Sequence, residues 1–134
     1  MNEKLMREML SKKKWAVIGA TPNEEKTGNR IVKKLLEHGY EVYCVNPYYE
    51  KVEGLTCYKD VESLPVTPDC VDFVVSPRVT EKSIKNLDSS KIKYLWLQPG
   101  SYDEETAKAA EDKGFHVVHE GACVMMAVDM IGAI

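Results

Sequence analysis

The sequence lacks the features of several large classes of protein. No run approaches the about 20 consecutive apolar residues that a membrane-spanning helix requires. The first 14 residues alternate charged residues with Leu and Met, so they also lack the continuous apolar stretch of a signal peptide. The net charge is −3, whereas a protein whose main partner is the DNA backbone needs a basic face. We therefore expect a cytoplasmic protein that binds neither membranes nor nucleic acids.

Cysteine spacing excludes further classes. The four cysteines, at positions 44, 57, 70 and 123, form no C-x-x-C pair and have no zinc-ligand spacing relative to the three histidines. Nothing in the sequence points to secretion, so we expect reduced thiols in the cytosol rather than disulfides. We expect no metal site.

What is present is typical of one globular domain. The chain has 134 residues, of which 44% are hydrophobic and 29% charged, and domains usually contain about 100–200 residues. We expect a single domain over residues 1–134. Leu and Met recur at helical spacing near the start, which predicts a leading helix over residues 1–11.

Apolar segments alternate with amphipathic ones along the rest of the chain. The apolar segments predict five strands, at residues 15–19, 41–45, 71–75, 94–98 and 115–119. The amphipathic segments predict helices at residues 28–38, 80–87, 103–113 and 122–130. Residues 48–64 are less regular, with a short strand open at 55–58 and a helical turn at 60–64. Because parallel strands need long crossovers, this order predicts an α/β fold with an open, parallel, five-stranded, Rossmann-like sheet and helices on both faces, a three-layer sandwich.

The segments that follow the strands are expected to form the ligand site. In an open α/β sheet, a ligand binds beyond the carboxyl ends of the strands, near the point where the strand order reverses. These segments are rich in Gly, Pro, Ser, Thr and Asn and contain few strong acids or bases. Such a lining suits the binding of a nucleotide by backbone amides better than it suits proton transfer.

The loop after the first strand carries a phosphate-binding pattern. Gly19 ends the strand and Gly28 begins the next helix; glycine lets the backbone approach a phosphate, and a helix start offers free N–H groups. The loop is not G-x-G-x-x-G, because Thr21 stands at the second glycine. It is not a Walker A loop, because Glu25 replaces the glycine before Lys26. Spacing alone leaves a ligand-free turn equally open.

The end of the second strand disfavours plain NAD. NAD-binding Rossmann domains place Asp or Glu there to bind the ribose diol, whereas this chain has Asn46 and Pro47 followed by two tyrosines. Lys51, or alternatively Lys26, could face an additional ribose phosphate. For one lysine alone, a solvated surface charge is the simpler interpretation.

Short motifs in this order resemble those of the small stand-alone coenzyme A-binding proteins, whose domain is similar to the amino-terminal domain of the succinyl-CoA synthetase alpha subunit. The resemblance covers residues 12–126. The motifs are V-I-G-A-T-P-N (17–23), G-Y-E-V (39–42), V-N-P (45–47), V-E-G-L (52–55), F-V-V-S-P (73–77), L-W-L-Q-P-G (95–100) and Cys123.

The resemblance implies a role for each segment. The positions that would bind the coenzyme A diphosphate are Gly19, Ala20, Thr21, Pro22, Asn23, Gly28 and Asn29. Those near the adenine–ribose end are Val45, Asn46 and Pro47, with Lys51, or Lys26 as the alternative, at the ribose 3′-phosphate. The wall beside the ligand would be Val75, Ser76 and Pro77, and the pantetheine arm would pass Gln98, Pro99 and Gly100.

The sequence departs from this family pattern in two respects. Relatives often carry a lysine directly after Asn-Pro, where this chain has Tyr48, so the 3′-phosphate contact moves to Lys51. The synthetase also needs a phosphorylatable histidine in a further domain, which these residues do not include, so we do not carry its catalysis over.

Two side chains near the same edge have more than one interpretation. His119, beside Glu120, could act as a base, but no nucleophile accompanies it at a recognisable spacing. The Cys123 thiol could pair with the sulfur of the coenzyme or react as a nucleophile if its pKa were lowered. Packing is the simpler role for both.

These observations lead to one main hypothesis and two alternatives. We expect binding of coenzyme A or an acyl-CoA at the carboxyl ends of the strands, without catalysis by this chain. A small NAD(P)-binding oxidoreductase or redox-sensing domain is the first alternative, because it shares the topology. An interaction protein that uses the cleft only as a scaffold is the second. The expected partner is a small-molecule nucleotide; a second copy of the chain or an acyl-CoA enzyme stays open.

Overall fold

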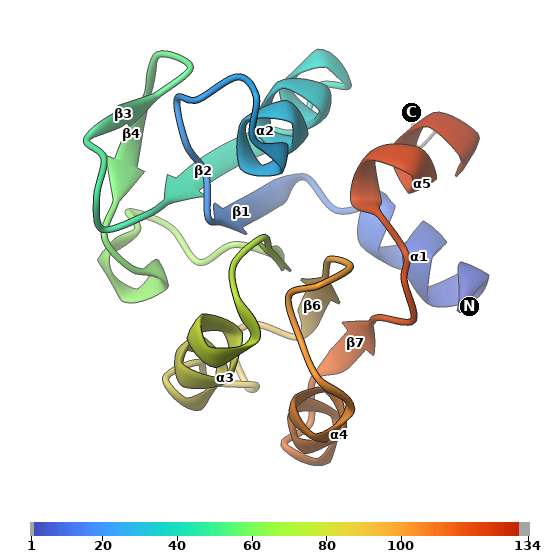
Figure 1. Ribbon diagram of the computed structural model, residues 1–134. Helices are drawn as coiled ribbons and strands as arrows, with labels where there is room; N and C mark the ends of the chain where they lie inside the picture. Colours follow the sequence, from blue (N-terminus) through green and yellow to red (C-terminus); the bar gives the residue numbers. More distant parts are fainter. Residues whose placement is uncertain (1, 132–134) are drawn as a thin grey trace.

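The computed structural model describes residues 2–131 and shows a central sheet with helices on both faces (Figure 1). The strands are β1 (Lys14–Ile18), β2 (Glu41–Val45), β3 (Lys51–Val52), β4 (Leu55–Tyr58), β5 (Cys70–Phe73), β6 (Tyr94–Leu97) and β7 (His116–Val118). The helices are α1 (Glu3–Leu10), α2 (Thr27–Glu37), α3 (Pro77–Lys85), α4 (Glu104–Asp112) and α5 (Val124–Ile131), with a 3-10 turn, η1 (Val61–Ser63). None of the helices within residues 2–131 has the length and apolar character needed to cross a membrane.

The sheet is mostly parallel and has the strand order β3-β4-β2-β1-β5-β6-β7. Only the β3–β4 pair is antiparallel among the pairs that the described residues form. The expected α/β class is confirmed, but the expectation of five strands is wrong, because residues 2–131 form seven. The two additional strands are β3 and β4. They pair because Glu53 and Gly54 between them both have left-handed backbone, with φ 50° and 78°, and form a two-residue hairpin turn.

Helix α3 begins earlier than expected. The amphipathic pattern predicts residues 80–87, but the helix runs over Pro77–Lys85. Proline has a φ suited to the first turn of a helix and needs no hydrogen-bond partner for an N–H there. Pro77 therefore begins the helix as well as ending the strand segment, and the first turn of α3 lies directly at the end of β5.

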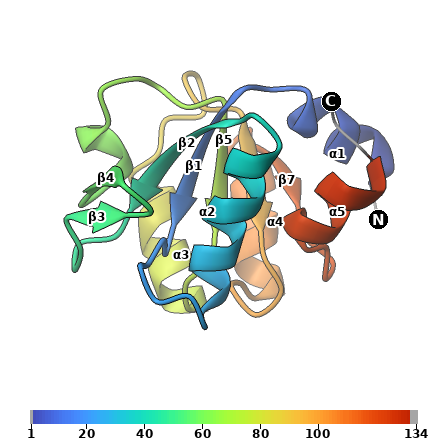
Figure 2. The same ribbon diagram turned by 90° about the horizontal axis from the view of Figure 1, so that it is seen from above.

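Two hydrophobic cores lie on opposite faces of the sheet. Helices α1, α2 and α5 cover one face, and α3 and α4 cover the other (Figures 1 and 2). The first core contains Trp15 and Trp96, whose ring centroids are 6.2 Å apart. The second contains Phe73 and Leu95, both fully buried. Strands that are buried on both faces have nearly continuous apolar sequences. The central strands can therefore be identified from the sequence.

The strand order reverses at β1. This strand pairs with β2 on one side and with β5 on the other. The chain leaves β1 toward α2 on one face and leaves β5 toward α3 on the opposite face. Divergent connections of this kind open a crevice at the carboxyl ends of the strands.

Candidate functional site

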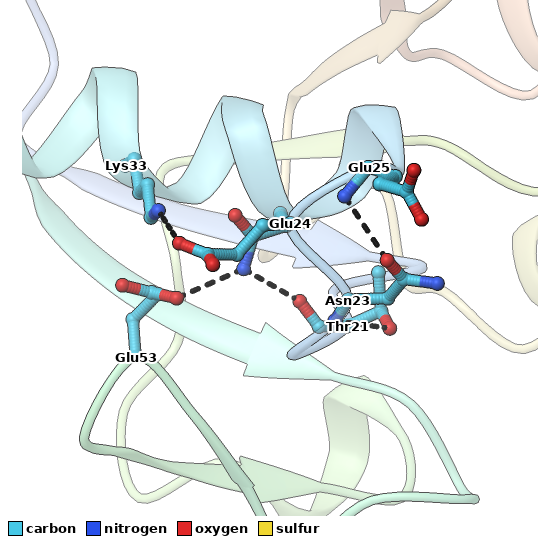
Figure 3. A network of polar contacts seen from close by, with 7 residues as sticks. Thr21, Asn23, Glu24, Glu25, Lys33 and Glu53 are labelled. Atoms are coloured by element: carbon cyan, nitrogen blue, oxygen red, sulfur yellow. Dashed lines mark hydrogen bonds and ion pairs between the residues drawn. The ribbon is translucent and has the colours of Figure 1, made fainter.

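The loop between β1 and α2 is held in shape by its own side chains. Thr21 Oγ1 accepts a hydrogen bond from the backbone N–H of Asn23 at 3.2 Å, and Asn23 Oδ1 accepts one from the N–H of Glu25 at 3.0 Å (Figure 3). Ala20 and Thr21 are buried, whereas Pro22 and Asn23 form the exposed tip. The loop is thus preformed, and an incoming ligand need not order it.

The start of α2 favours an anion. Lys26 precedes the helix in extended backbone, and no described side chain caps the first N–H groups. The first turn contains no acidic residue. Free N–H groups and the positive end of the helix dipole both stabilise negative charge at this position.

Two glycines allow the loop and the helix to approach each other closely. A Cβ atom on Gly28 would lie 2.1 Å from the carbonyl oxygen of Gly19, and one on Gly19 would lie 2.3 Å from the carbonyl oxygen of Val74. Gly19 also has φ 101°. Close packing of backbone against backbone therefore requires glycine at both positions, and a phosphate contact at Gly28 stays a prediction.

Two asparagines brace the loop from within. The buried Asn29 donates from Nδ2 to the carbonyl oxygen of Thr21 at 3.0 Å and to Glu53 Oε2 at 2.9 Å (Figure 3). Asn46 donates from Nδ2 to the carbonyl oxygen of Ala20 at 2.9 Å. Both amides thus hold the loop. Glu53 was not anticipated from the sequence, because no local pattern marks a hairpin residue that reaches another element.

A crevice of about 570 Å³ opens beside the start of α2. It brings together Val75 and Ser76 after β5 with Gln98, Pro99 and Gly100 after β6, as the motif order predicts. The remaining lining residues are Thr27, Val74, Ser101, Cys123 and Met125. Pro77 does not line the crevice and instead begins α3.

Gln98 is fixed by the segment that leads into α5. Its Oε1 accepts a hydrogen bond from the N–H of Val124 at 3.0 Å, and its Nε2 lies 3.3 Å from Cys123 Sγ. Only 3% of Gln98 is exposed. The side chain therefore sets the wall of the crevice and joins β6 to α5.

A second hollow, of about 300 Å³, lies between η1 and α3 at the ends of β1 and β2. We call it the α3–η1 groove. Its lining residues are Ile18, Val45, Pro47, Lys59, Asp60, Val61, Glu62, Val79, Lys82, Ser83, Asn86 and Leu87. Val45 and Pro47 were predicted at the site, whereas Lys26 and Lys51 line neither the groove nor the crevice.

Of the remaining candidate side chains, Cys123 lines the crevice and His119 does not. His119 Nε2 lies 3.9 Å from Glu111 Oε2, and its ring meets the ring of Tyr102 edge-on, so it packs beside α4 and does not line the crevice. The four cysteines are free thiols, and burial raises the pKa of Cys44 to about 12. Residues 2–131 contain no group of His, Cys, Asp and Glu arranged to hold a metal ion.

Known proteins match this chain over most of its length. The sequence profile of a family described as "CoA binding domain" matches residues 13–129. ADP-forming acetate–CoA ligase I of Archaeoglobus fulgidus is 31% identical over 113 residues, covering 77% of this chain and 16% of that protein. Subunit alpha of ADP-forming acetate–CoA ligase II of Pyrococcus furiosus is 27% identical over 120 residues, covering 87% of this chain and 26% of that protein.

A solved structure has the same architecture. It is a hypothetical protein from Pyrococcus horikoshii OT3, with a TM-score of 0.89 and 36% sequence identity. The match covers 96% of this chain and 91% of that one. By contrast, the chain spans about a sixth to a quarter of the length of the two ligases.

Proposed function

Because this chain belongs to the family of CoA binding domains, we propose that it binds coenzyme A or an acyl-CoA across the carboxyl ends of its parallel strands. The relatives named as acetate–CoA ligases carry a homologous segment within a much longer chain. The proposal therefore concerns binding and carries over no ligase reaction. A second copy of the chain or an acyl-CoA enzyme as partner, and a location in the cytoplasm, stay predictions.

One observation carries the proposal: three suitable surfaces follow one another along the sheet edge. The α3–η1 groove lies at the ends of β2 and β1, the open start of α2 follows β1, and the crevice lies at the ends of β5 and β6. The strand order β2-β1-β5-β6 sets them in a row. Coenzyme A is an extended molecule with adenosine at one end, a diphosphate in the middle and a thiol-bearing arm at the other, which matches this sequence of surfaces.

The crevice suits the pantetheine arm. That arm alternates methylene groups with two amides, and the crevice combines apolar side chains such as Val75 and Met125 with the hydroxyl of Ser76 and the backbone around Gly100. Among its described lining residues there is no carboxylate, histidine or lysine, and the one thiol, that of Cys123, lies 3.3 Å from Gln98 Nε2. This supports a role in binding without a reaction catalysed by these residues.

Titration calorimetry of the full chain with CoA, acetyl-CoA, NAD and NADP tests the proposal. We expect saturable binding of CoA and acetyl-CoA. In a separate urea-unfolding measurement, either ligand at about 100 times its Kd should raise the free energy of unfolding by about 2.7 kcal/mol. Binding of NADP without binding of CoA would support an oxidoreductase and contradict the proposal. Release of free thiol from acetyl-CoA on incubation with the protein would contradict the absence of catalysis.

A matched pair of variants locates the binding site. Ser76 lines the crevice, is exposed and makes no side-chain bond that caps α3, so Ser76→Trp adds bulk without removing an internal contact. We expect it to weaken CoA binding by about tenfold or more, which is about 1.4 kcal/mol. Ala109→Trp, on an exposed position of α4, is the control. Equal CoA affinities for the two variants would place the ligand elsewhere.

A further inference from the structure

The α3–η1 groove exists because one part of the sheet has no covering helix. Between β2 and β5 the chain forms only the β3–β4 hairpin and the short turn η1, whereas the other crossovers contain α-helices. The last residues of β1 and β2, Ile18 and Val45, consequently face a hollow rather than a helix. Val61 of η1 and Val79 of α3 form its two sides.

The groove has the chemistry of a site for a flat aromatic base. Its floor is aliphatic, and Val79 at its side is 43% exposed, so an apolar surface is accessible to a ligand there. Ser83 of α3 and Asn86, directly after α3, add hydrogen-bonding groups along the same wall. A purine has apolar faces and a polar edge, so it suits such a lining.

Two cations flank the groove. Lys59 directly follows β4, and Lys82 lies on α3 across the groove. Within residues 2–131, no hydrogen bond or ion pair engages the Nζ atom of either lysine. Two acidic residues also line the groove. One of them, Asp60, caps η1, because its Oδ1 accepts hydrogen bonds from the backbone N of Ser63 at 2.8 Å and from Ser63 Oγ at 2.6 Å. Glu62 is the remaining acid.

With the adenine placed in the α3–η1 groove by the proposed function, we propose that Lys59 and Lys82, which line this groove, bind the ribose 3′-phosphate of the ligand. This inference rests on the proposed function and names two lysines as an alternative to Lys51 for that phosphate. Lys51 lies exposed on β3 and does not line the groove. Relatives often carry a lysine directly after Asn-Pro, where this chain has Tyr48. Lys59 and Lys82 would supply the positive charge that this position lacks.

Comparison of CoA with dephospho-CoA tests the inference, because the two molecules differ only in the 3′-phosphate. We expect the wild-type chain to bind CoA more tightly. The double variant Lys59→Ala/Lys82→Ala should lose about tenfold in CoA affinity, the loss typical of a charge-assisted hydrogen bond, while its affinity for dephospho-CoA stays unchanged. Lys51→Ala is the matched control and should change neither affinity. Thermal unfolding of each variant without ligand verifies the fold.

Each other outcome overturns a specific part of the inference. Selective loss of CoA affinity in Lys51→Ala would return the phosphate to Lys51. An equal loss of both ligands in the double variant would show that the lysines act on another part of the molecule. Equal affinity of the wild-type chain for both ligands would remove the 3′-phosphate contact altogether. If neither ligand binds the wild-type chain, the proposed function itself fails, and this result is distinct from the other three.

Discussion

At the scale of single residues, the polar side chains nearest the proposed diphosphate site hold backbone rather than present themselves to a ligand. The side-chain amide of Asn29 donates a hydrogen bond to the carbonyl oxygen of Thr21, and that of Asn46 donates one to the carbonyl oxygen of Ala20. The groups left for an anion are the backbone N–H groups at the start of α2. A loop that is braced in this way binds with less loss of conformational entropy than a loop that the ligand has to order.

Gly28→Ala is expected to destabilise the fold itself. Its Cβ would lie 2.1 Å from the carbonyl oxygen of Gly19, so the turn between β1 and α2 has to shift. Forced overpacking of this kind costs about 1–3 kcal/mol, measured as the free energy of unfolding in urea. Gly54→Ala is the control, because its Cβ meets no atom within 4 Å and only the left-handed backbone, φ 78°, opposes it, at about 1 kcal/mol. A loss for Gly28→Ala no larger than that for Gly54→Ala would contradict the steric argument.

Asp72 is an acidic residue buried inside the sheet. It lies in the middle of β5, fully buried between Val17 of β1 and Trp96 of β6. Neither of its carboxyl oxygens has a hydrogen-bond partner among the described residues. Burial raises the pKa of the Asp72 carboxyl well above its usual value, because desolvation disfavours the charged form.

The raised pKa of Asp72 predicts a pH dependence of stability. A group whose pKa is higher in the folded than in the unfolded state stabilises the fold below the unfolded pKa, and this contribution is lost as the pH rises toward the folded pKa. Asp72→Asn removes the titration. Relative to this variant, the wild-type chain should lose up to about 1.4 kcal/mol per pH unit above about pH 4, measured by urea unfolding at several pH values. The exposed Asp112→Asn serves as control, and a pH-independent difference for Asp72→Asn would rule out the titration.

At the scale of elements, the β3–β4 hairpin and α2 form one unit around the loop between β1 and α2. The hairpin lies at the edge of the sheet, beside the start of α2 (Figure 2). Glu53 in the hairpin turn accepts the Asn29 hydrogen bond, although its backbone is left-handed. The hairpin therefore helps to position a loop to which it is not connected in sequence.

Loss of this contact should loosen the hairpin. A hydrogen bond to a charged group contributes about 1.5–3 kcal/mol, so Glu53→Ala should increase the hydrogen-exchange rate of hairpin amides, such as the Cys57 N–H that donates to Glu50 O, by about tenfold or more. Glu50→Ala changes an exposed side chain of the same segment and is the control. Similar exchange in the two variants would mean that the hairpin does not depend on Asn29.

At the scale of the whole molecule, most of the architecture could be predicted from the sequence. The alternation of apolar and amphipathic segments gives the parallel strands and their helices, because that periodicity is set by burial of whole elements. Strand β3 could not be predicted, because two residues carry no periodicity and its pairing depends on the Glu53–Gly54 turn.

The candidate site was predictable to a similar degree. Motif order correctly brings Ser76 and Gln98 into one crevice, since both follow parallel strands. Lys59 and Lys82 could not be identified, because a single lysine in a sequence has no pattern that separates a groove from the solvated surface. The role proposed for them depends on the absence of an α-helix between β2 and β5, which is a property of the folded sheet.

The contact between α1 and α5 has a consequence for how this domain can be used. Glu3 and Ile131 line the same small apolar hollow between these helices, so the first and last described helices meet on the face of the sheet opposite α3 (Figure 1). In a longer polypeptide, the flanking segments would therefore join this module on the same face of the sheet (Figure 1). Such an arrangement allows a fold of this kind to be joined to further domains without disturbing the strand ends.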